Sequence, residues 1–450
     1  MESINKYIDE HKEEYISWLF EACSQPSISA QNVGMSEMAD LVKGYLDKLG
    51  AEDVQLVPTG GYPFVYGEMK GKQTDRTLSF YNHYDVQPVE PIEEWKSEPF
   101  VPVIRDGRIF GRGTADNKGN LIARMCAVDA WKKVYGELPL NIKFVYEGEE
   151  EVGSPNLGDF AKNHPDKVKT DGFLWEGGSR TVGGPVHVAL GAKGMCYVEL
   201  SVRTAESDLH SMAAAVVENP AWRLVWALAG LKSPEGKILI DGFYDKVSPV
   251  SDLDRMYIEN MEFDEEATRM SFGIKGFLGG MTGYHLKEQL LCSPTCNIAG
   301  FISGYTGKGG KTVLPSKASV KMDLRLVPDQ DPQEVLRLLR THLDSKGFSD
   351  IEMQVHSWKP PFRTDPGHPL AKTVISAVKK VYGHEPAVWR NLAGTSPIYD
   401  LCREGGYGAV QVGVANEDSR AHAPNENIFV EDFIEGIKLV ACVMNDFALV

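Results

Sequence analysis

The sequence predicts an α/β protein with a mostly parallel sheet, helices on both faces of that sheet, and an inserted α+β unit. Three observations lead to this prediction. In residues 1–193, short apolar runs alternate with segments of helical period, which is typical of parallel sheets covered by helices. In residues 195–203 and 319–327, apolar residues recur at every second position, which indicates antiparallel strands with one exposed face. The last segment, residues 363–450, returns to the first pattern.

The first segment opens with a charged amphipathic pattern between Ile4 and Phe20, which predicts a helix. After it, apolar runs that end in turn residues predict strands, and apolar residues three to four positions apart predict the helices between them. The expected strands are 78–81, 141–146 and 172–175, and the expected helices are 36–49, 119–135 and 156–163.

The middle segment, residues 194–362, reads as a separate unit with one sheet face free to cover something. A pair of prolines at positions 360 and 361 marks its end. Its expected strands are 195–203 and 319–327, and its expected helices are 220–231 and 332–346.

The last segment is expected to hold a helix at 368–382, a strand at 409–414 and a helix at 430–449. If His422 joins polar residues of the first segment in one site, this segment completes the first domain. The expected division is therefore one domain built from residues 1–193 and 363–450, with residues 194–362 inserted into it.

The composition indicates a folded protein of two or three domains, because 450 residues with 42% hydrophobic content can bury a large core. The 47 basic and 63 acidic residues give a formal charge of -16, which argues against nucleic-acid and membrane partners. An anionic substrate must therefore meet a local basic group. Neither a signal-peptide pattern nor an apolar stretch of membrane-spanning length is visible, so we expect a cytoplasmic protein.

The seven cysteines are odd in number, widely spaced and mostly within apolar runs, which favours reduced buried thiols over a disulfide framework. Cys292 and Cys296 could also be read as a thiolate metal pair, but the second Cys/His pair of such sites is missing. The cysteines occupy positions 23, 126, 196, 292, 296, 402 and 442.

Five clusters of acidic or imidazole-bearing residues follow apolar runs, where an α/β sheet would gather polar side chains into one crevice. His83 and Asp85 form the first cluster and point the same way on an extended strand, because they lie two residues apart. Alone, such a pair indicates a surface turn. At the end of an apolar run, His83 becomes a candidate metal ligand and Asp85 a candidate for orienting its ring.

Asp116 follows a glycine-dense loop and precedes a helix. Alone it reads as a helix N-cap, but a loop without bulk would also let its carboxylate bridge two cations. Glu149, Glu150 and Glu151 come soon after the strand expected at 141–146, and their mutual repulsion beside a buried strand requires cations or protons. One glutamate can then bind metal while an adjacent one takes a proton from water.

Glu176 ends another expected strand, and His422 lies in a loop of small residues after a strand. Each is a weak signal by itself, and His422 alone reads as a satisfied loop histidine. Together, the five clusters predict a two-metal hydrolase centre. Oxygen and imidazole ligands without thiolates suit zinc, manganese or cobalt.

The motifs His-x-Asp, Gly-Arg-Gly-x-x-Asp-x-Lys-Gly, Glu-Glu-x-Gly-Ser, Glu and Ala-His-x-x-Asn-Glu occur in this order over nearly the whole chain. This order resembles the dinuclear zinc metallopeptidases of the carnosinase, carboxypeptidase-G and aminoacylase family, family twenty, and most of all its carnosinase-like dipeptidases. The resemblance implies two divalent metal ions per subunit, zinc first and manganese or cobalt as alternatives, and a cis peptide bond after Asp116. The implied roles are Asp116 as the ligand shared by both metals, His83 and Glu176 at one metal, Glu151 and His422 at the other, Glu150 as general base, and Asp85 as the residue that orients His83.

The middle segment resembles the lid of that family, which also forms the dimer interface, so the resemblance implies a homodimer. His210 would reach the active site of the partner subunit and stabilise the oxyanion there. Arg325 would clamp the α-carboxylate of a substrate, although a strand arginine paired with a surface acid is the plainer interpretation. The resemblance places Thr312, Arg325, His356 and Thr395 at positions that contact substrate.

Two departures from the family pattern leave the substrate open. Carnosinase-like dipeptidases usually carry aspartate at the position of Glu176, whereas glutamate resembles the carboxypeptidase and deacylase branch. Residues 211–215 read Ser-Met-Ala-Ala-Ala, where the dipeptidases usually have glycines. We predict a dipeptidase that cleaves an amide bond with a metal-activated water. An aminoacylase or carboxypeptidase acting on N-acyl amino acids is the alternative, and an inactive peptide-binding protein, which would lack a ligand or the base, is a remote one.

Overall fold

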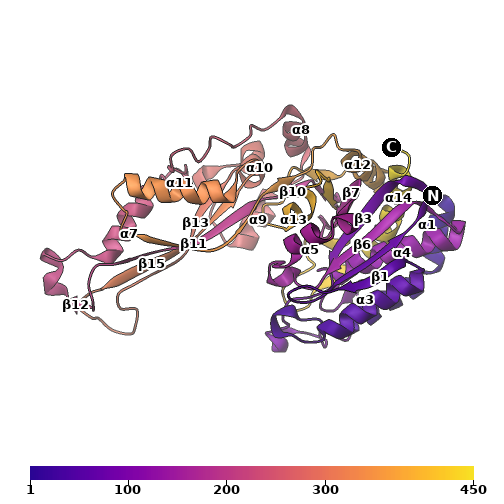
Figure 1. Ribbon diagram of the computed structural model, residues 1–450, viewed down its shortest axis with the longest axis horizontal. Helices are drawn as coiled ribbons and strands as arrows, with labels where there is room; N and C mark the ends of the chain where they lie inside the picture. The colour runs from indigo at the N-terminus through magenta and orange to yellow at the C-terminus, as the bar shows by residue number, and fades with distance from the viewer.

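The computed structural model describes all residues from Met1 to Val450 and places two sheet-containing units along its longest axis (Figure 1). The larger unit is built around an eight-stranded sheet and holds both chain termini. The smaller unit is built around a four-stranded sheet and comes from the middle of the sequence. The two units are joined by a short ladder between β10 (Gly191–Ala192) and β17 (Phe362–Arg363), where the chain leaves and re-enters the larger unit.

The eight-stranded sheet is mixed, with its parallel part in the centre. β3 pairs parallel with β6 and β7, and β19 continues the parallel ladder beside β7. The sheet is antiparallel where β1 and β2 extend it at one edge and where β9 meets β19. In spatial order the strands are β1 (Glu52–Val57), β2 (Phe64–Met69), β6 (Leu138–Glu147), β3 (Gly71–His83), β7 (Gly172–Trp175), β19 (Ala409–Gln411), β9 (His187–Ala189) and β18 (Ala387–Trp389).

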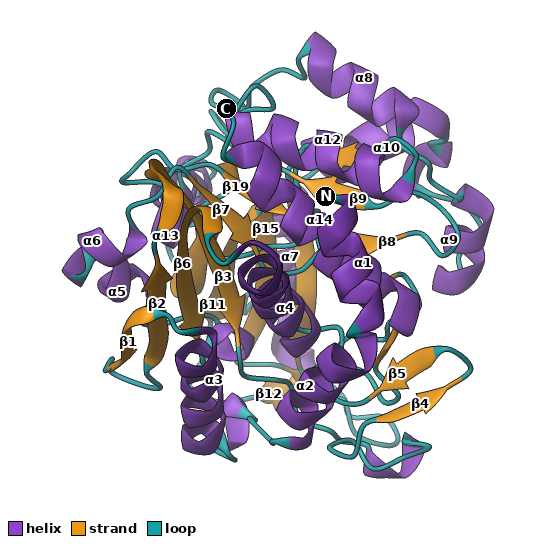
Figure 2. Ribbon diagram, turned by 90° about the vertical axis from the view of Figure 1, so that its right-hand side faces the viewer, coloured by secondary structure: helices purple, strands orange, loops and turns teal.

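Helices cover both faces of this sheet (Figure 2). Alternate residues of β3 and β7 divide between the two faces: Phe80 and Leu174 belong to the largest core cluster, whereas Tyr81 and Trp175 belong to the core on the other side. The larger core is built with α1 (Glu2–Glu10), α2 (Lys12–Ser24), α3 (Met35–Leu49), α4 (Lys118–Tyr135), α12 (Pro369–Tyr382) and α14 (Val430–Phe447). The opposite face carries α5 (Leu157–Asn163), α6 (Pro165–Val168) and α13 (Ile398–Cys402).

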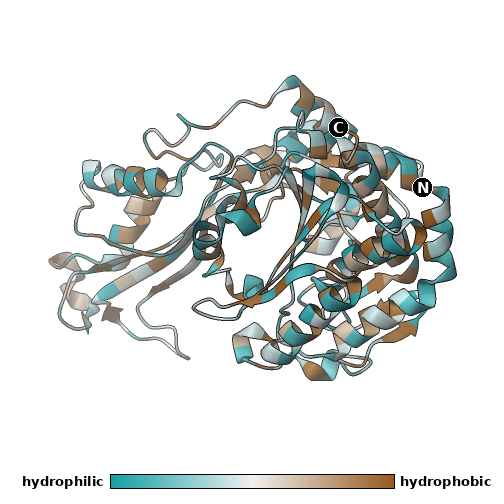
Figure 3. Ribbon diagram, turned by 45° about the vertical axis from the view of Figure 1, so that its right-hand side comes forward, coloured by the Kyte–Doolittle hydropathy of each residue, from teal (hydrophilic) through white to brown (hydrophobic).

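The four-stranded sheet is antiparallel throughout, and two helices cover only one of its faces. Along β15, Val320, Met322 and Leu324 are buried under these helices, whereas the alternating Lys321 and Asp323 lie on the open face. Hydrophobic and hydrophilic residues alternate along the helices of both units, as expected for helices with one side on a sheet (Figure 3). The elements in spatial order are β13 (Thr295–Ser303), β15 (Lys317–Leu326), β11 (Gly194–Arg203) and β16 (Glu352–Lys359), with α7 (Pro220–Ala229) and α11 (Pro332–Ser345).

A helical segment of the insertion packs on the larger unit instead of on the four-stranded sheet. It consists of α8 (Asp252–Asn260), α9 (Glu265–Phe272) and α10 (Gly283–Cys292). The buried carboxylate of Asp254 on α8 lies 3.1 Å from Arg363 Nη1 and 3.2 Å from Arg390 Nη1. Arg390 directly follows β18, so this group of charges fixes the helical segment to the edge of the large sheet.

Short ladders complete the fold. A three-stranded sheet holds the loops that flank the amino end of α4, and two-stranded ladders lie at the ends of both units. These strands are β4 (Val103–Arg105), β5 (Arg108–Phe110) and β21 (Asn427–Phe429), β8 (Ser179–Arg180) with β20 (Ala415–Asn416), and β12 (Leu209–His210) with β14 (Val313–Leu314). The single-turn 3-10 helices are 29–31, 92–94, 150–152, 211–215 and 278–280.

The structure confirms the predicted fold class, and most of the predicted helices and strands agree within one or two residues at each end. The helix expected between Ile4 and Phe20 is two helices, α1 and α2, with a break at His11, and the strand expected at 78–81 begins earlier, at Gly71. The strand expected at 409–414 ends earlier, at Gln411. Beyond it the backbone packs against the segment after β7: a Cβ atom added to Gly413 would lie 2.2 Å from the carbonyl oxygen of Gly177. Two strands that the sequence analysis missed, β13 and β16, complete the smaller sheet. All seven cysteines are free, and none of the helices is long and apolar enough to cross a membrane.

Candidate active site and metal centre

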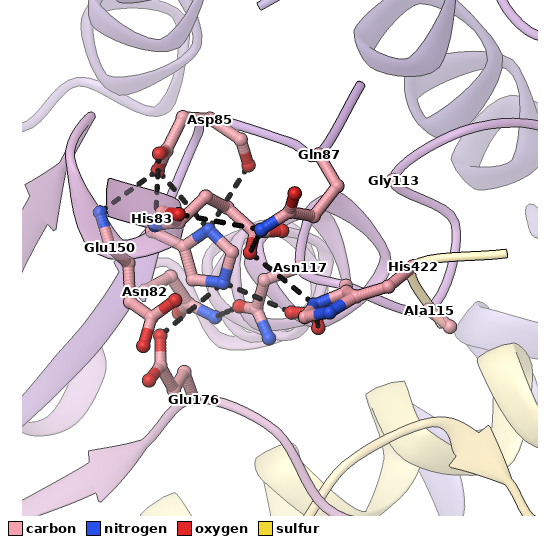
Figure 4. Close-up of polar contacts among 12 residues, drawn as sticks. Asn82, His83, Asp85, Gln87, Gly113, Ala115, Asn117, Glu150, Glu176 and His422 are labelled. Atoms are coloured by element: carbon pink, nitrogen blue, oxygen red, sulfur yellow. Dashed lines mark hydrogen bonds and ion pairs between the residues drawn. The ribbon is translucent and has the colours of Figure 1, made fainter. Parts of the chain in front are cut away.

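The predicted site residues meet at the carboxyl ends of the central strands (Figure 4). His83 is the last residue of β3, and Glu176 follows β7 directly. Glu151 lies in the 3-10 turn after β6, Asp116 in the loop that enters α4, and His422 in a loop of the last segment. Parallel strands bring their carboxyl ends to one edge of a sheet, which places His83, Glu151 and Glu176 close together. Asp116 and His422 reach the same edge on loops.

The two carboxylate oxygens of Asp116 face two different histidines. His83 Nε2 lies 3.0 Å from Asp116 Oδ1, and His422 Nε2 lies 3.1 Å from Asp116 Oδ2. Each histidine also faces one glutamate: His83 Nε2 is 3.5 Å from Glu176 Oε2, and His422 Nε2 is 3.3 Å from Glu151 Oε2. The result is two adjacent groups, each with one histidine, one glutamate and one oxygen of Asp116. We call them the His83 half and the His422 half.

The donor set fits divalent cations. One ligand atom from each of His83, Asp116 and Glu151 lies within 4.8 Å of the others. Two buried carboxylate oxygens, Glu151 Oε1 and Glu176 Oε2, have no hydrogen-bond donor within the chain. An unsatisfied buried carboxylate oxygen is costly, and a cation in this position would remove the cost. Imidazole and carboxylate donors without thiolates suit zinc, manganese or cobalt.

Two glutamates of the site have raised pKa values. Burial raises the pKa of Glu150 to about 7, and the nearby Asp116 and Glu151 carboxylates add to this effect, against the opposite influence of His83. Burial, together with the neighbouring Glu150, raises the pKa of Glu176 well above its usual value. A carboxylate with a pKa near neutrality can accept a proton and release it again in one reaction cycle.

The two histidines respond to the carboxylates around them. Burial alone would lower the pKa of His83, but Glu176 and the hydrogen-bonded Asp116 raise it well above the usual value. Hydrogen bonds with Asp116 and Glu151 raise the pKa of His422 to about 10. Burial would raise the pKa of Asp116, but its hydrogen bonds with both histidines hold it below the usual range. The site thus attracts positive charge strongly.

Asp85 contacts both His83 and the glutamate turn. The Nδ1 atom of His83 lies 3.0 Å from the backbone oxygen of Asp85 and 3.3 Å from its Oδ1. The carboxylate of Asp85 also accepts hydrogen bonds from the backbone N–H groups of Glu150, at 3.3 Å, and Glu151, at 3.1 Å. One fully buried side chain therefore lies where it can orient both the imidazole and the turn (Figure 4). The peptide bond between Asp116 and Asn117 is cis, as the family resemblance implied.

Sequence analysis missed the role of Glu426 in positioning the loop of Asp116. The fully buried carboxylate of Glu426 accepts three backbone hydrogen bonds, from Gly113, Ala115 and Asp116, each 2.9 Å long. It also pairs with Arg112 Nη1 at 2.8 Å. Glu426 lies four residues after the second histidine, so it ties the two loops of the site together. Its place inside the motif Ala-His-x-x-Asn-Glu was the available signal.

Gln87 was also missed. Its Nε2 donates to Glu151 Oε2 at 2.8 Å and to the backbone oxygen of Glu151 at 3.3 Å. The amide therefore fixes the carboxylate that faces His422 (Figure 4). A half-buried glutamine four residues after His83 carries no pattern that would single it out in the sequence.

The structure does not bring the predicted substrate-binding residues of the insertion together in one site. Arg325 Nη1 donates to Thr395 Oγ1 at 2.6 Å, which joins β15 to a loop of the larger unit. His356 Nε2 lies 3.2 Å from a carboxylate of Glu199 on the neighbouring strand. His210 lies on β12, at the end of the smaller unit farther from the eight-stranded sheet (Figure 1). In the ladder there it pairs with Val313, next to Thr312.

A family model and full-length relatives both match this chain. The family model described as "Peptidase family M20/M25/M40" matches residues 79–446. The chain is 29% identical to the Cys-Gly metallodipeptidase dug1 of Schizosaccharomyces pombe, over 100% of this chain and 99% of that protein. It is also 29% identical to the human Beta-Ala-His dipeptidase, over 100% of this chain and 93% of that protein.

A solved structure extends the comparison to the fold. The M20 family metallo-carboxypeptidase Sso-CP2 from Sulfolobus solfataricus is 40% identical and superimposes with a TM-score of 0.89. The match covers 97% of this chain and 100% of the other. The likeness therefore includes the insertion as well as the large sheet.

Proposed function

The chain belongs to peptidase family M20/M25/M40, and we propose that it is a metal-dependent dipeptidase holding two divalent cations. The observation that carries this proposal is the division of the Asp116 oxygens between two histidine and glutamate pairs. Relatives that match along the full chain are named dipeptidases, which supports the substrate class.

In this proposal the His83 half, completed by Glu176, holds one cation, and the His422 half, completed by Glu151, holds the other. Asp116 is shared. Zinc is the proposed metal, with manganese and cobalt as alternatives that the same donors accept. When bound, the cations polarise the substrate carbonyl and make water a stronger nucleophile near neutral pH.

Glu150 acts as the general base in this scheme. Its carboxylate forms no hydrogen bond within the chain, while its backbone is held by Asp85. With a pKa near 7, it can take a proton from the attacking water and return that proton to the leaving nitrogen. Asp85 keeps the ring of His83 in position throughout the cycle.

Arg325 is proposed as the residue that binds the substrate carboxylate. The chain carries a formal charge of -16, so a small anionic substrate needs a cationic contact. Arg325 is only partly buried, and the hydroxyl of Thr395 accepts from its Nη1. Its Nε lies 3.9 Å from Asp323 Oδ2, the strand acid of the plainer interpretation, but this contact is long and leaves Nη2 available for a substrate carboxylate. A clamp of this kind serves dipeptides and other substrates with a free α-carboxylate.

A carboxypeptidase or aminoacylase acting on N-acyl amino acids is the second candidate. Glu176 favours it, as does the likeness to the Sulfolobus protein named a metallo-carboxypeptidase. A panel of free dipeptides and their N-acetylated counterparts separates the two. A dipeptidase should turn over the free forms at least about tenfold faster, because it recognises the free amine, whereas comparable rates would favour the second candidate.

We further propose a homodimer that forms through an inserted lid domain spanning residues 194–362. The supporting observation is a set of exposed apolar side chains on the smaller unit: Trp222 and Trp226 of α7 and Ile302 of β13. β12, which carries His210 and pairs with the residue after Thr312, lies at the end of the smaller unit farther from the eight-stranded sheet, so these two residues would serve the partner's site. Sedimentation analysis of the full chain, with Trp226→Glu as the disrupting variant, tests this arrangement.

The function is tested most directly at Glu150. Glu150→Gln should lower kcat by about 100- to 10,000-fold while bound metal stays near two ions per subunit, because the base is lost and the ligands remain. Glu149→Gln is the matched control, since the neighbouring Glu149 carboxylate accepts from Asn156 outside the site. Full activity of Glu150→Gln would show that Glu150 is not the general base.

The clamp is tested at Arg325. Arg325→Ala should raise KM about 100-fold for dipeptides with a free carboxylate, since a charge-assisted contact is lost. Dipeptide amides lack that carboxylate, so we expect the wild-type chain to turn them over poorly and the substitution to leave this turnover unchanged. Arg337→Ala, on the outer surface of α11, is the control for loss of one positive charge. An unchanged KM in Arg325→Ala would contradict the assignment.

A further inference from the structure

Arg124 is a fully buried arginine with no carboxylate partner. It lies on α4, two turns after Asp116, and 1% of its surface is exposed. Its guanidinium group donates four hydrogen bonds instead of forming an ion pair. The acceptors are the backbone oxygen of Tyr81 at 2.6 Å, Asn82 Oδ1 at 2.6 Å, the backbone oxygen of Leu174 at 2.9 Å, and the backbone oxygen of Trp175.

These acceptors lie at the carboxyl ends of two neighbouring strands. Tyr81 and Asn82 are the residues just before His83 on β3. Leu174 and Trp175 are the last residues of β7, just before Glu176. One guanidinium group therefore fixes the backbone from which His83 and Glu176 project.

The same group reaches the loop of Asp116 through one further bond. Asn82 accepts from Arg124 with its oxygen and donates with its nitrogen to the side-chain oxygen of Asn117. Asn117 follows Asp116 directly, so all three protein ligands of the His83 half are connected to Arg124 within a few bonds.

Arginine suits this position better than lysine. Its planar fork presents several donors in fixed directions and can span two strands at once, whereas a lysine ammonium is a single point charge. Burial lowers the pKa of Arg124 to about 10, so the group still carries its charge at neutral pH. That charge lies beneath a cluster of carboxylates and partly offsets their repulsion.

The His422 half has no contact with Arg124. Glu151 is held by Gln87 and by the backbone contacts to Asp85, and His422 lies on a loop joined to the site through Glu426. Both halves share Asp116 and the contacts of Asp85, but only the His83 half has its histidine and glutamate at the ends of strands that Arg124 holds.

We propose that Arg124 is a positioning residue that sets the metal affinity of the His83 half and leaves that of the His422 half nearly unchanged. This proposal rests on the two-metal site proposed above. Residues that orient metal ligands typically change affinity by about 10- to 100-fold. Arg124→Lys should therefore weaken one of two cobalt-binding events by about that factor.

The experiment is a Co²⁺ titration of the metal-free full chain, followed by visible absorption and by metal analysis after gel filtration. The wild-type chain should bind two ions, and Arg124→Lys should bind one with wild-type affinity and the second about 10- to 100-fold more weakly. Lys132→Met is the matched control: Lys132 lies on the same helix and donates to the backbone oxygen of Leu49, away from the site. It should bind both ions as the wild-type chain does.

Double variants identify the half that is affected. In the His422→Ala background only the His83 half remains, and adding Arg124→Lys should weaken the remaining ion. In the Glu176→Gln background the His83 half is already damaged, and adding Arg124→Lys should change little. If Arg124→Lys does not fold, Asn82→Ala removes one acceptor and keeps the arginine, and it should weaken the same half.

The outcomes separate the two proposals. A wild-type chain that binds fewer than two ions would contradict the two-metal site itself. If the wild-type chain binds two ions, and Arg124→Lys and Asn82→Ala bind both with wild-type affinity, the two-metal site stands and the proposed role of Arg124 is overturned. Equal weakening of both halves would also overturn it, because a general loss of structure, and not selective positioning, would then explain the effect.

Discussion

The two halves of the candidate metal centre share Asp116 but differ in how the fold holds them. In the His83 half, the side chain of His83 is 1% exposed and that of Glu176 is 9% exposed. In the His422 half, the glutamate is equally covered, but the side chain of His422 is 55% exposed. The similar donor sets therefore lie in different surroundings, one beneath the surface and one at it.

The difference follows from the elements that carry the ligands. His83 and Glu176 project from the ends of adjacent central strands, where ladder hydrogen bonds and the arginine of α4 fix the backbone. His422 lies in a loop and has a positive φ of 64°, a conformation that a non-glycine residue holds only when its neighbours enforce it. One half is therefore built into the sheet, and loops bring the other half to it.

The largest expected effect is on the stability of the metal-free chain. His83→Ala should lower the free energy of unfolding by about 3–5 kcal/mol, because it removes the cationic partner of the buried Glu176 and one of the two histidines that face Asp116. His422→Ala should lower it by less than about 1 kcal/mol, since the imidazole is more than half exposed and Glu151 keeps its hydrogen bond from Gln87. Urea unfolding with a chelator present measures both. Equal losses would show that burial does not distinguish the halves.

A second effect concerns the pH dependence of stability and Glu147, which pairs with His83 across the β3–β6 ladder. Burial raises the pKa of Glu147 to about 8, so the folded chain binds a proton that the unfolded chain has released. In the metal-free chain, this group should therefore make stability fall between pH 4.5 and 8, by at most about 1.4 kcal/mol per pH unit.

Glu147→Gln checks this expectation, because the amide keeps the shape of the side chain but cannot titrate. The pH dependence of thermal unfolding should be flatter in the variant than in the wild-type chain. Glu149→Gln, which changes an acid with a hydrogen bond outside the site, serves as the control. The same slope in all three proteins would exclude Glu147 as its source.

The smallest effect is expected at the His422 half. Gln87→Leu removes the amide that holds Glu151 and should weaken one bound Co²⁺ ion by about tenfold, with the other unchanged. Gln31→Leu is a control on a glutamine with only a long contact near the surface. Weakening of the ion that Arg124→Lys affects, instead of the other one, would contradict the assignment of separate supports.

The candidate ligands that were predicted from the sequence share one property. Each follows a local pattern, such as an apolar strand or a glycine-rich loop, that can be recognised in the sequence. His83, Glu150 and Glu176 each follow an apolar strand, and the strands proved to be β3, β6 and β7. Asp116 was found because glycines precede it and a helix follows. Family resemblance then ordered these residues by motif, and the ladders of parallel strands placed them at one sheet edge.

The supporting residues could not be found in this way. Glu426 bonds to backbone groups more than 300 positions away, and Arg124 bonds to the ends of two strands that are not adjacent to it in sequence. Neither bond leaves a periodic trace in the residues around it. The strands β13 and β16 were missed for a related reason, because their exposed faces carry apolar residues such as Ile302 and Trp358 that blur the two-residue alternation.

The shared carboxylate of Asp116 has a thermodynamic consequence. A cation bound by one of its oxygens changes the charge and the orientation that the other oxygen offers, so the two binding events are linked. Linkage is reciprocal: the factor by which filling the His83 half changes affinity at the His422 half equals the factor in the opposite direction. Although the two sites differ in burial and support, each must therefore change the metal affinity of the other by the same factor.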